Sequence, residues 1–151
     1  MANQLKDIIN FAIEKEIEAY EFYQDASKKI ASDANLKKTF EELANEESKH
    51  RNFLQDFLEG DIHEFHLPDV ADYHVSETAE KPKLSTEMKF VDAITLAMKK
   101  EEEAMNMYAG LAKGGSNDKQ KELFAELSKM EEMHKVRLEK IYVNASYGEV
   151  W

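Results

Sequence analysis

The residues of this sequence that are best suited to chemistry form two Glu-x-x-His motifs. One copy is Glu47 with His50, and the other is Glu131 with His134. Residues three apart lie on the same face of a helix, with Cβ atoms about 5–6 Å apart, so each pair can hold one metal ion. Carboxylate and imidazole ligands together suit iron or manganese. The two pairs therefore predict a metal centre with two ions.

Two further glutamates belong to the same pattern. Glu16 and Glu101 are each followed by a tyrosine seven positions later, Tyr23 and Tyr108. The two Glu/Tyr pairs are 85 positions apart in the sequence, and the two Glu-x-x-His pairs are 84 apart. Each half of the chain thus reads Glu-x-x-Ala-x-x-x-Tyr and then Glu-x-x-His, which indicates a duplicated unit.

The elements that must position these residues are helices, because apolar residues recur at intervals of three and four. This spacing predicts helices over residues 3–31, 35–58, 86–112 (with a start at Ser85 or Thr86) and 117–143. Asp33 or Asn35 is expected to cap the second helix, and Ser116 or Asn117 the fourth. Each apolar stripe is interrupted only near its middle, by Glu16, Glu47, His50, Glu101, Glu131 and His134.

The connections between these helices predict the fold. Short loops near residues 32–34 and 114–116 make each helix pair an antiparallel hairpin. Residues 61–84 contain two prolines and little helical rhythm, and they are long enough to run the length of a bundle. We therefore expect an all-α four-helix bundle with a single domain over 1–151. Its two hairpins are joined by a long crossover, and the second and third helices are parallel.

Composition excludes several function classes. The 151 residues carry a formal net charge of −11, which disfavours nucleic acid and anionic membranes as partners. No cysteine is present, which excludes disulfides, thiolate metal sites and a cysteine nucleophile. No apolar run reaches the length of a membrane span or a signal peptide, so a cytoplasmic protein is the default expectation.

Burial of four carboxylates requires an explanation. Desolvation costs several kcal/mol per ion, against a net domain stability of only about 5–15 kcal/mol. The carboxylates must therefore be protonated, face water, or be neutralised by cations. Two divalent ions match their combined charge. A metal-free binding or scaffold bundle with protonated or hydrated acids is the alternative.

The segments EIEAYEFY, EESKH, EEEAMNMY and EEMH resemble the rubrerythrin branch of the ferritin-like di-iron carboxylate family. The resemblance covers nearly the whole chain except the crossover and the tail SYGEVW. It implies two iron ions bridged by Glu47 and Glu131, with Glu16 and Glu101 as terminal ligands and His50 and His134 completing the set. Tyr23 and Tyr108 would be candidate catalytic phenols beside these ligands. Manganese or a mixed pair of metals fits the same ligand types.

The resemblance also implies a function and partners. We expect an oxidoreductase that reduces hydrogen peroxide or dioxygen and takes part in oxidative stress defence, as a homodimer. Rubrerythrins usually carry a second iron domain with four cysteines, which is missing here. Electrons would therefore come from a separate donor protein, such as a rubredoxin or a reductase. The alternative within the same fold is a ferroxidase or iron-handling role, in which Fe(II) is the substrate.

Several residues have more than one interpretation. Many rubrerythrins have an extra Glu one turn after the ligand of the third helix, where this chain has Ala104; Glu102 or Glu103 could replace it only through a helix bulge. The acidic residues off the stripes are expected to be solvated, although any could lie behind the site: Glu14, Glu18, Glu21, Glu46, Glu102, Glu103 and Glu132. We expect His63, His66 and His74 to lie in a solvated loop, with a separate surface metal site as the alternative. Trp151 is expected to dock on the bundle or on another subunit.

Overall fold

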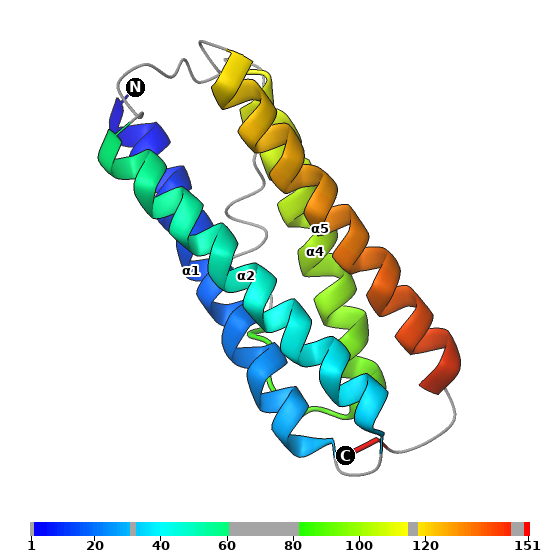
Figure 1. Ribbon diagram of the computed structural model, residues 1–151. Helices are drawn as coiled ribbons and strands as arrows, with labels where there is room; N and C mark the ends of the chain where they lie inside the picture. The colour runs from blue at the N-terminus through cyan, green and yellow to red at the C-terminus, as the bar shows by residue number, and fades with distance from the viewer. Residues whose placement is uncertain (1, 31–32, 61–81, 115–117, 146–149) are drawn as a thin grey trace.

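The computed structural model describes residues 2–30, 33–60, 82–114, 118–145 and 150–151. These residues form four helices and no strand (Figure 1): α1 (Ala2–Lys29), α2 (Ala34–Gly60), α4 (Phe90–Ala112) and α5 (Asp118–Ala145). The prediction of an all-α four-helix bundle is confirmed.

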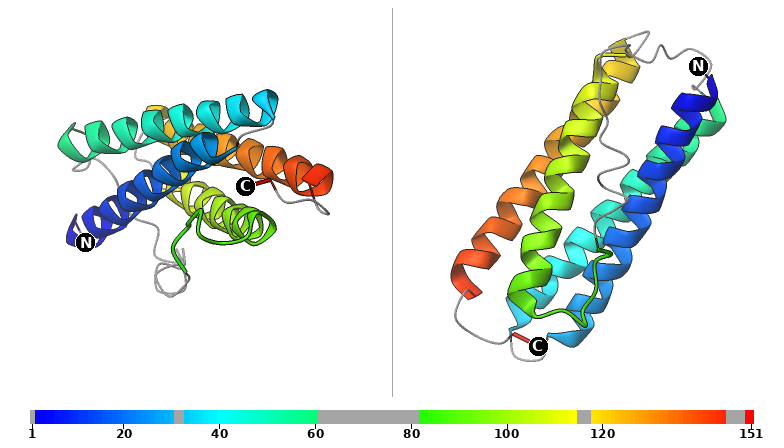
Figure 2. Two further views of the ribbon diagram at one scale, coloured as in Figure 1. Left: turned by 90° about the horizontal axis from the view of Figure 1, so that it is seen from below. Right: turned by 180° about the vertical axis from the view of Figure 1, so that it is seen from behind.

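The helices pair as two antiparallel hairpins, α1 with α2 and α4 with α5 (Figure 1). α2 and α4 run in the same direction, as predicted, so the chain must pass from one end of the bundle to the other between them. Figure 2 shows α1 and α4 side by side when the molecule is seen from behind. The predicted crossover falls mainly on residues 61–81, which lie outside the described residues, as do His63, His66 and His74.

The helix boundaries agree with the sequence-based prediction within two residues, apart from the start of α4. The Leu36 N–H donates to Asp33 Oδ1 at 3.0 Å, so Asp33 is the residue that caps α2. Ser116 and Asn117, the predicted caps of α5, lie outside the described residues.

The predicted start of the third helix at Ser85 or Thr86 was wrong, because α4 begins at Phe90. The backbone before it has other partners. The Glu87 N–H donates to the Ser85 hydroxyl at 3.0 Å, and the Leu84 N–H donates to Glu18 Oε1 on α1 at 2.9 Å. A serine side chain that bonds to nearby backbone competes with helix formation, and helical spacing alone does not reveal this competition.

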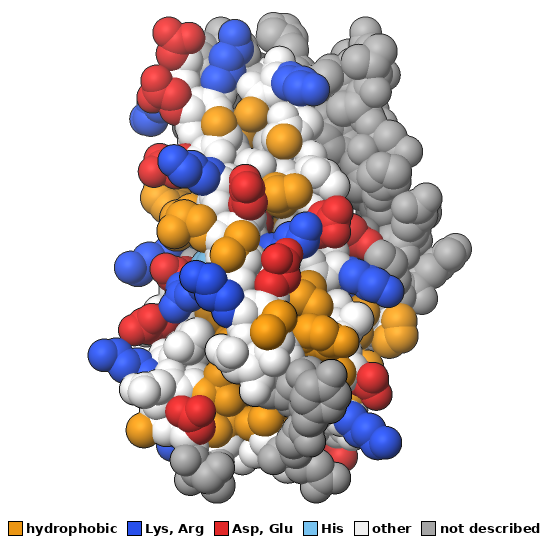
Figure 3. All heavy atoms as spheres, turned by 90° about the vertical axis from the view of Figure 1, so that its right-hand side faces the viewer, with side chains coloured by type: hydrophobic (Ala, Val, Ile, Leu, Met, Phe, Trp, Pro, Cys, Tyr) orange, Lys and Arg blue, Asp and Glu red, His pale blue; other side chains and the backbone are white. Residues whose placement is uncertain are grey.

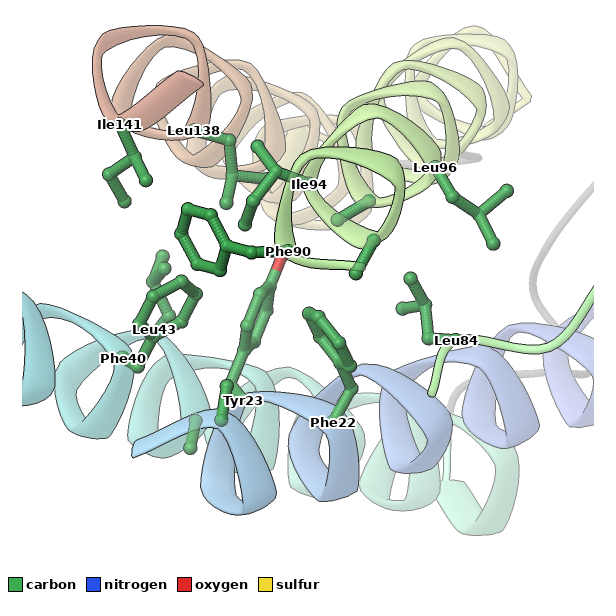
Figure 4. Packing of buried hydrophobic residues seen from close by; sticks show 14 of the residues in the cluster. Phe22, Tyr23, Phe40, Leu43, Leu84, Phe90, Ile94, Leu96, Leu138 and Ile141 are labelled. Carbon is green, nitrogen blue, oxygen red and sulfur yellow. The ribbon is translucent and has the colours of Figure 1, made fainter. Parts of the chain in front are cut away.

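The predicted stripes form the core. Two apolar clusters lie along the bundle, and the polar residues of the stripes lie between them. Figure 4 shows the cluster that contains Tyr23, which stands on α1 between Phe22 and Phe40 with its oxygen directed toward α4. Phe57, Tyr108 and Phe124 belong to the second cluster. Tyr23 and Tyr108 each have no exposed surface, so both lie fully inside the protein.

The surface outside this core is mixed in charge. On the side of α4 and α5, acidic and basic side chains alternate with apolar ones (Figure 3). The acidic residues Glu14, Glu21, Glu102 and Glu132 are exposed, as expected for a solvated face. The acidic excess of the chain therefore does not form a single acidic patch on the face that Figure 3 shows.

Trp151 packs against the end of the bundle. Its ring centroid lies 4.9 Å from that of Phe90 in an edge-on contact, and its Nε1–H donates to the Met88 carbonyl at 3.1 Å. Lys29 Nζ lies 5.5 Å from the same ring. Of the two positions considered for this residue, docking on the bundle is the one observed.

Replacement of Trp151 by alanine is expected to lower the free energy of unfolding by about 2 kcal/mol. Loss of a core Trp or Phe costs about 3–5 kcal/mol, and this ring is only partly buried. Urea denaturation followed by circular dichroism measures the effect. Tyr142→Ala, at an exposed aromatic residue on α5, is the control and should change stability by less than about 0.5 kcal/mol. Equal effects of the two variants would contradict the docking.

Candidate metal centre

The structure brings the six predicted polar residues together in the middle of the bundle. Their ligand atoms form two groups, within each of which all the atoms lie within 4.8 Å of one another. One group contains Glu16 and His50, and the other contains Glu101 and His134. Glu47 and Glu131 belong to both groups. All six side chains are buried, with at most 4% of their surface exposed.

Each histidine contacts a glutamate from the opposite hairpin. His50 Nδ1 lies 2.6 Å from Glu131 Oε1, and His134 Nδ1 lies 2.6 Å from Glu47 Oε1. The two rings are stacked, with centroids 5.7 Å apart and planes inclined by 13°. The Nδ1 atoms of both rings thus face the carboxylates, which is the orientation that a shared metal centre requires.

The two tyrosines hydrogen-bond to the remaining glutamates, again from the opposite hairpin. The Tyr23 hydroxyl donates to Glu101 Oε1 at 2.7 Å, and the Tyr108 hydroxyl donates to Glu16 Oε1 at 2.5 Å. Burial, reinforced by Glu101 for Tyr23 and by Glu16 for Tyr108, raises the pKa of each phenol well above its ordinary value. Both phenols therefore stay protonated and act as hydrogen-bond donors.

Four polar atoms of this cluster are buried without a hydrogen-bond partner. Among the described residues these atoms are Glu16 Oε2, Glu47 Oε1, Glu101 Oε2 and His134 Nδ1. The 2.6 Å contact between His134 Nδ1 and Glu47 Oε1 is thus close without hydrogen-bond geometry. Orphaned buried atoms are costly unless something else satisfies them, and lone pairs of oxygen and nitrogen that face a common space are what a divalent cation binds. The residues present therefore fit a pair of metal ions.

Protons take the place of cations when no metal is bound. Burial, followed by the charges of the neighbouring carboxylates, raises the pKa of Glu47 and of Glu101 well above the ordinary range. Burial alone would lower the pKa of His50, but its hydrogen bond with Glu131 and the nearby carboxylate of Glu16 raise that pKa to about 10. Metal ligation needs deprotonated ligands, so ions that bound here would release these protons.

The metal-free chain is therefore expected to lose stability as the pH rises from 6.5 to 10. In this range the folded chain keeps a proton on His50 that the unfolded chain, with a pKa of 6.5, has released. The raised pKa values of Glu47 and Glu101 act in the same direction. Thermal denaturation in the presence of a chelator at several pH values measures the slope. His50→Gln should flatten it, and a melting temperature that rises with pH would contradict the assignment.

A pocket between α1 and α4 leads to the cluster. It has a volume of about 40 Å³, enough for a molecule of two or three heavy atoms. Carboxylates of Glu16, Glu47, Glu101 and Glu131 line its inner end together with both tyrosines. Most of the remaining wall is apolar, formed by Phe11, Ala12, Ala19, Leu84, Ala97, Ala104 and Met107, and the charged residues Lys15, Lys100 and Glu103 also line it. The pocket therefore places space for a small molecule next to the polar centre.

The acidic run after Glu101 does not add a residue to the cluster. α4 continues through Glu102, Glu103 and Ala104 as a regular α-helix without a bulge. Glu102 is exposed, whereas Glu103 and Ala104 line the pocket. Neither glutamate belongs to the two groups of ligand atoms among the described residues.

Two glutamates expected on the solvated face lie elsewhere. Glu18 is buried and bonds to Lys100 and Lys15, which hold its pKa below the ordinary value although burial opposes them. Glu46 is half-buried, and its Oε2 accepts a hydrogen bond from His134 Nε2 at 2.9 Å. Partners on another helix, Lys100 and His134, hold both side chains. Sequence spacing along one helix could not reveal either interaction.

Fold and site together define a class: a ferritin-like four-helix bundle with a buried cluster of glutamates and histidines. The sequence matches the model of the rubrerythrin family over residues 7–142. The chain therefore belongs to the rubrerythrin family, as the resemblance of its motifs predicted.

One solved structure supports the fold. A protein from Thermotoga maritima, described as a candidate ferritin-like diiron-carboxylate protein, matches with a TM-score of 0.66 and 22% sequence identity. The match covers 90% of this chain and 92% of that one. None of the curated proteins compared with the sequence matches it. In the described part of the chain, no helix has an apolar stretch long enough to cross a bilayer.

Proposed function

We propose that this chain is a di-iron oxidoreductase that reduces hydrogen peroxide, with electrons supplied by a separate donor protein. The observation that carries the proposal is the buried centre of four glutamates and two histidines, in which four polar atoms have no other partner among the described residues. Protein interiors tolerate such a cluster when cations neutralise it.

The division of the cluster into two groups suggests a role for each ligand. Glu47 and Glu131 belong to both groups, so they would bridge the two ions. Glu16 with His50 would hold one ion, and Glu101 with His134 would hold the other. Two ferrous ions bound there would supply the two electrons that, with two protons, convert hydrogen peroxide into two molecules of water.

The residues around this centre would orient the ligands and shape the access of small molecules to them. Tyr23 donates to one oxygen of Glu101, and Tyr108 donates to one oxygen of Glu16. Each hydrogen bond orients the other oxygen of that carboxylate toward the centre. The narrow pocket would admit a molecule of the size of hydrogen peroxide to the centre. Electrons must return from outside the chain, because the sequence has no cysteine and so no second iron site with thiolate ligands.

The test is an anaerobic optical titration of the Fe(II)-loaded chain with hydrogen peroxide. We expect about one peroxide consumed per two iron ions, with the iron still bound to the protein afterwards. A chemical reductant should then restore the starting spectrum. Release of oxidised iron, together with turnover in excess Fe(II) without any reductant, would contradict peroxide reduction and support a ferroxidase. Repetition with Mn(II) tests the choice of metal.

Tyr23→Phe and Tyr108→Phe are each expected to slow peroxide reduction about tenfold without loss of metal. Each substitution leaves a buried glutamate oxygen without its donor, which costs about 1–3 kcal/mol, and 1.4 kcal/mol corresponds to a factor of ten in rate. Tyr20→Phe is the matched control, because the Tyr20 hydroxyl accepts from Gln24 and does not contact the cluster. Unchanged rates in both variants would rule out a role for the phenols in the reaction.

A further inference from the structure

The two halves of the chain match at the proposed ligands but differ behind the histidines. The 84-residue offset that relates His50 to His134 also pairs Glu46 with Met130. The same offset pairs Phe53 with Arg137. The charged pair Glu46 and Arg137, which spans α2 and α5, thus corresponds to the apolar pair Met130 and Phe53 on the same two helices.

Behind His134 the charged pair forms a chain of hydrogen bonds. His134 Nε2 lies 2.9 Å from Glu46 Oε2, which also accepts from Arg137 Nη1 at 3.1 Å. Arg137 Nη2 in turn donates to Glu42 Oε2 at 2.9 Å. With its Nε2–H bound to a carboxylate, the ring keeps the Nδ1 lone pair directed at the cluster.

Behind His50 the equivalent space is a pocket. Its volume is about 280 Å³, and Phe53, Met130, Leu123 and Leu127 line it beside His50, with the charged residues Glu46, Lys49 and Glu126 also on its wall. The residues that the structure describes provide no hydrogen-bond partner for His50 Nε2, since the contacts of this ring involve Nδ1 and the stacked His134. The two imidazoles thus face the same carboxylates, but only the His134 ring has a hydrogen-bond partner for its Nε2 among the described residues.

We infer that Glu46, held by Arg137, is a positioning residue that makes the two metal positions unequal. The position formed with Glu101 and His134 would bind its ion more tightly than the position formed with Glu16 and His50. A carboxylate behind a metal-bound histidine fixes the tautomer and raises the basicity of the ring, and loss of such a partner typically costs about 10–100-fold in metal affinity. This inference rests on the proposed metal centre.

Titration of the metal-free chain with Co²⁺, followed by visible absorption and equilibrium dialysis, tests the inference. We expect two binding steps whose affinities differ by about tenfold or more. His134→Ala should remove the tighter step, and His50→Ala the weaker one. Glu46→Met, which copies the other half of the chain, should weaken the tighter step about 10–100-fold so that the two steps merge. Glu42→Gln is the matched control, because Glu42 contacts Arg137 but not His134.

A second variant tests the inference by adding a charged pair behind His50. Met130→Glu combined with Phe53→Arg supplies the missing pair behind His50 and should tighten the weaker step. Two equal steps in the original chain, or steps unchanged by Glu46→Met, would overturn the inference while the metal centre stands. Absence of Co²⁺ binding in the original chain would overturn the metal centre itself. Circular dichroism of each metal-free variant verifies that it folds.

Discussion

Replacement of both Glu47 and Glu131 by alanine is expected to abolish metal binding, with about two ions per chain lost. Both residues belong to both groups of ligand atoms, so the double variant removes two of the four ligands from each group. Metal analysis of protein from iron-replete cells, by mass spectrometry, measures the loss.

Two exposed glutamates provide the control for this experiment. Glu14 and Glu132 lie on the solvated surface of α1 and α5, and replacement of both by alanine removes the same formal charge. We expect full metal content in this variant. Unchanged metal content in the Glu47/Glu131 variant would refute the assigned centre, and equal losses in both variants would indicate nonspecific binding to an acidic protein.

Removal of the metal with a chelator is expected to lower the melting temperature by roughly 10–20 °C. A ligand present at a hundred times its dissociation constant stabilises the folded state by about 2.7 kcal/mol, and two ions by about twice that amount. In a domain of this size, 1 kcal/mol corresponds to about 2–4 °C. Differential scanning calorimetry with and without chelator measures the change.

This result separates the di-iron centre from the alternative of a metal-free helical bundle. A bundle whose core acids are protonated in its working state has no bound ion to lose, so a chelator would leave its melting temperature unchanged. The Glu47/Glu131 variant supplies the control, because without its bridging ligands it should no longer respond to the chelator. A chelator effect that persists in this variant would place the stabilising metal elsewhere.

The sequence predicted the architecture and the composition of the centre because both depend on periodicity. Glu16, Glu47, Glu101 and Glu131 are in phase with apolar neighbours on the same helix, so the burial of those neighbours brings the carboxylates inward. Because both halves repeat this pattern, all six residues lie at the same level along the long axis of the bundle. Whether they ligate metal stays a prediction that the experiments above address.

Features that depend on partners from other helices could not be predicted in this way. Arg137, which lies 91 residues away in sequence, helps to hold Glu46 beside His134. Lys100, at a separation of 82 residues, bonds to Glu18. Neither glutamate is in phase with a stripe, so spacing assigned both to the solvated face. The segment before α4 also depends on another helix, since the Leu84 N–H donates to Glu18 on α1.

The shortest contacts at the centre join one hairpin to the other. Tyr23 bonds to Glu101, Tyr108 to Glu16, and His50 lies against Glu131. Neither hairpin on its own contains a complete set of partners, although each carries the same motif. The centre therefore forms only when the two hairpins pack together. Ions bound there would hold the two hairpins to each other and resist their separation. An ancestral single hairpin with this motif would have needed a second copy of itself to build the same centre.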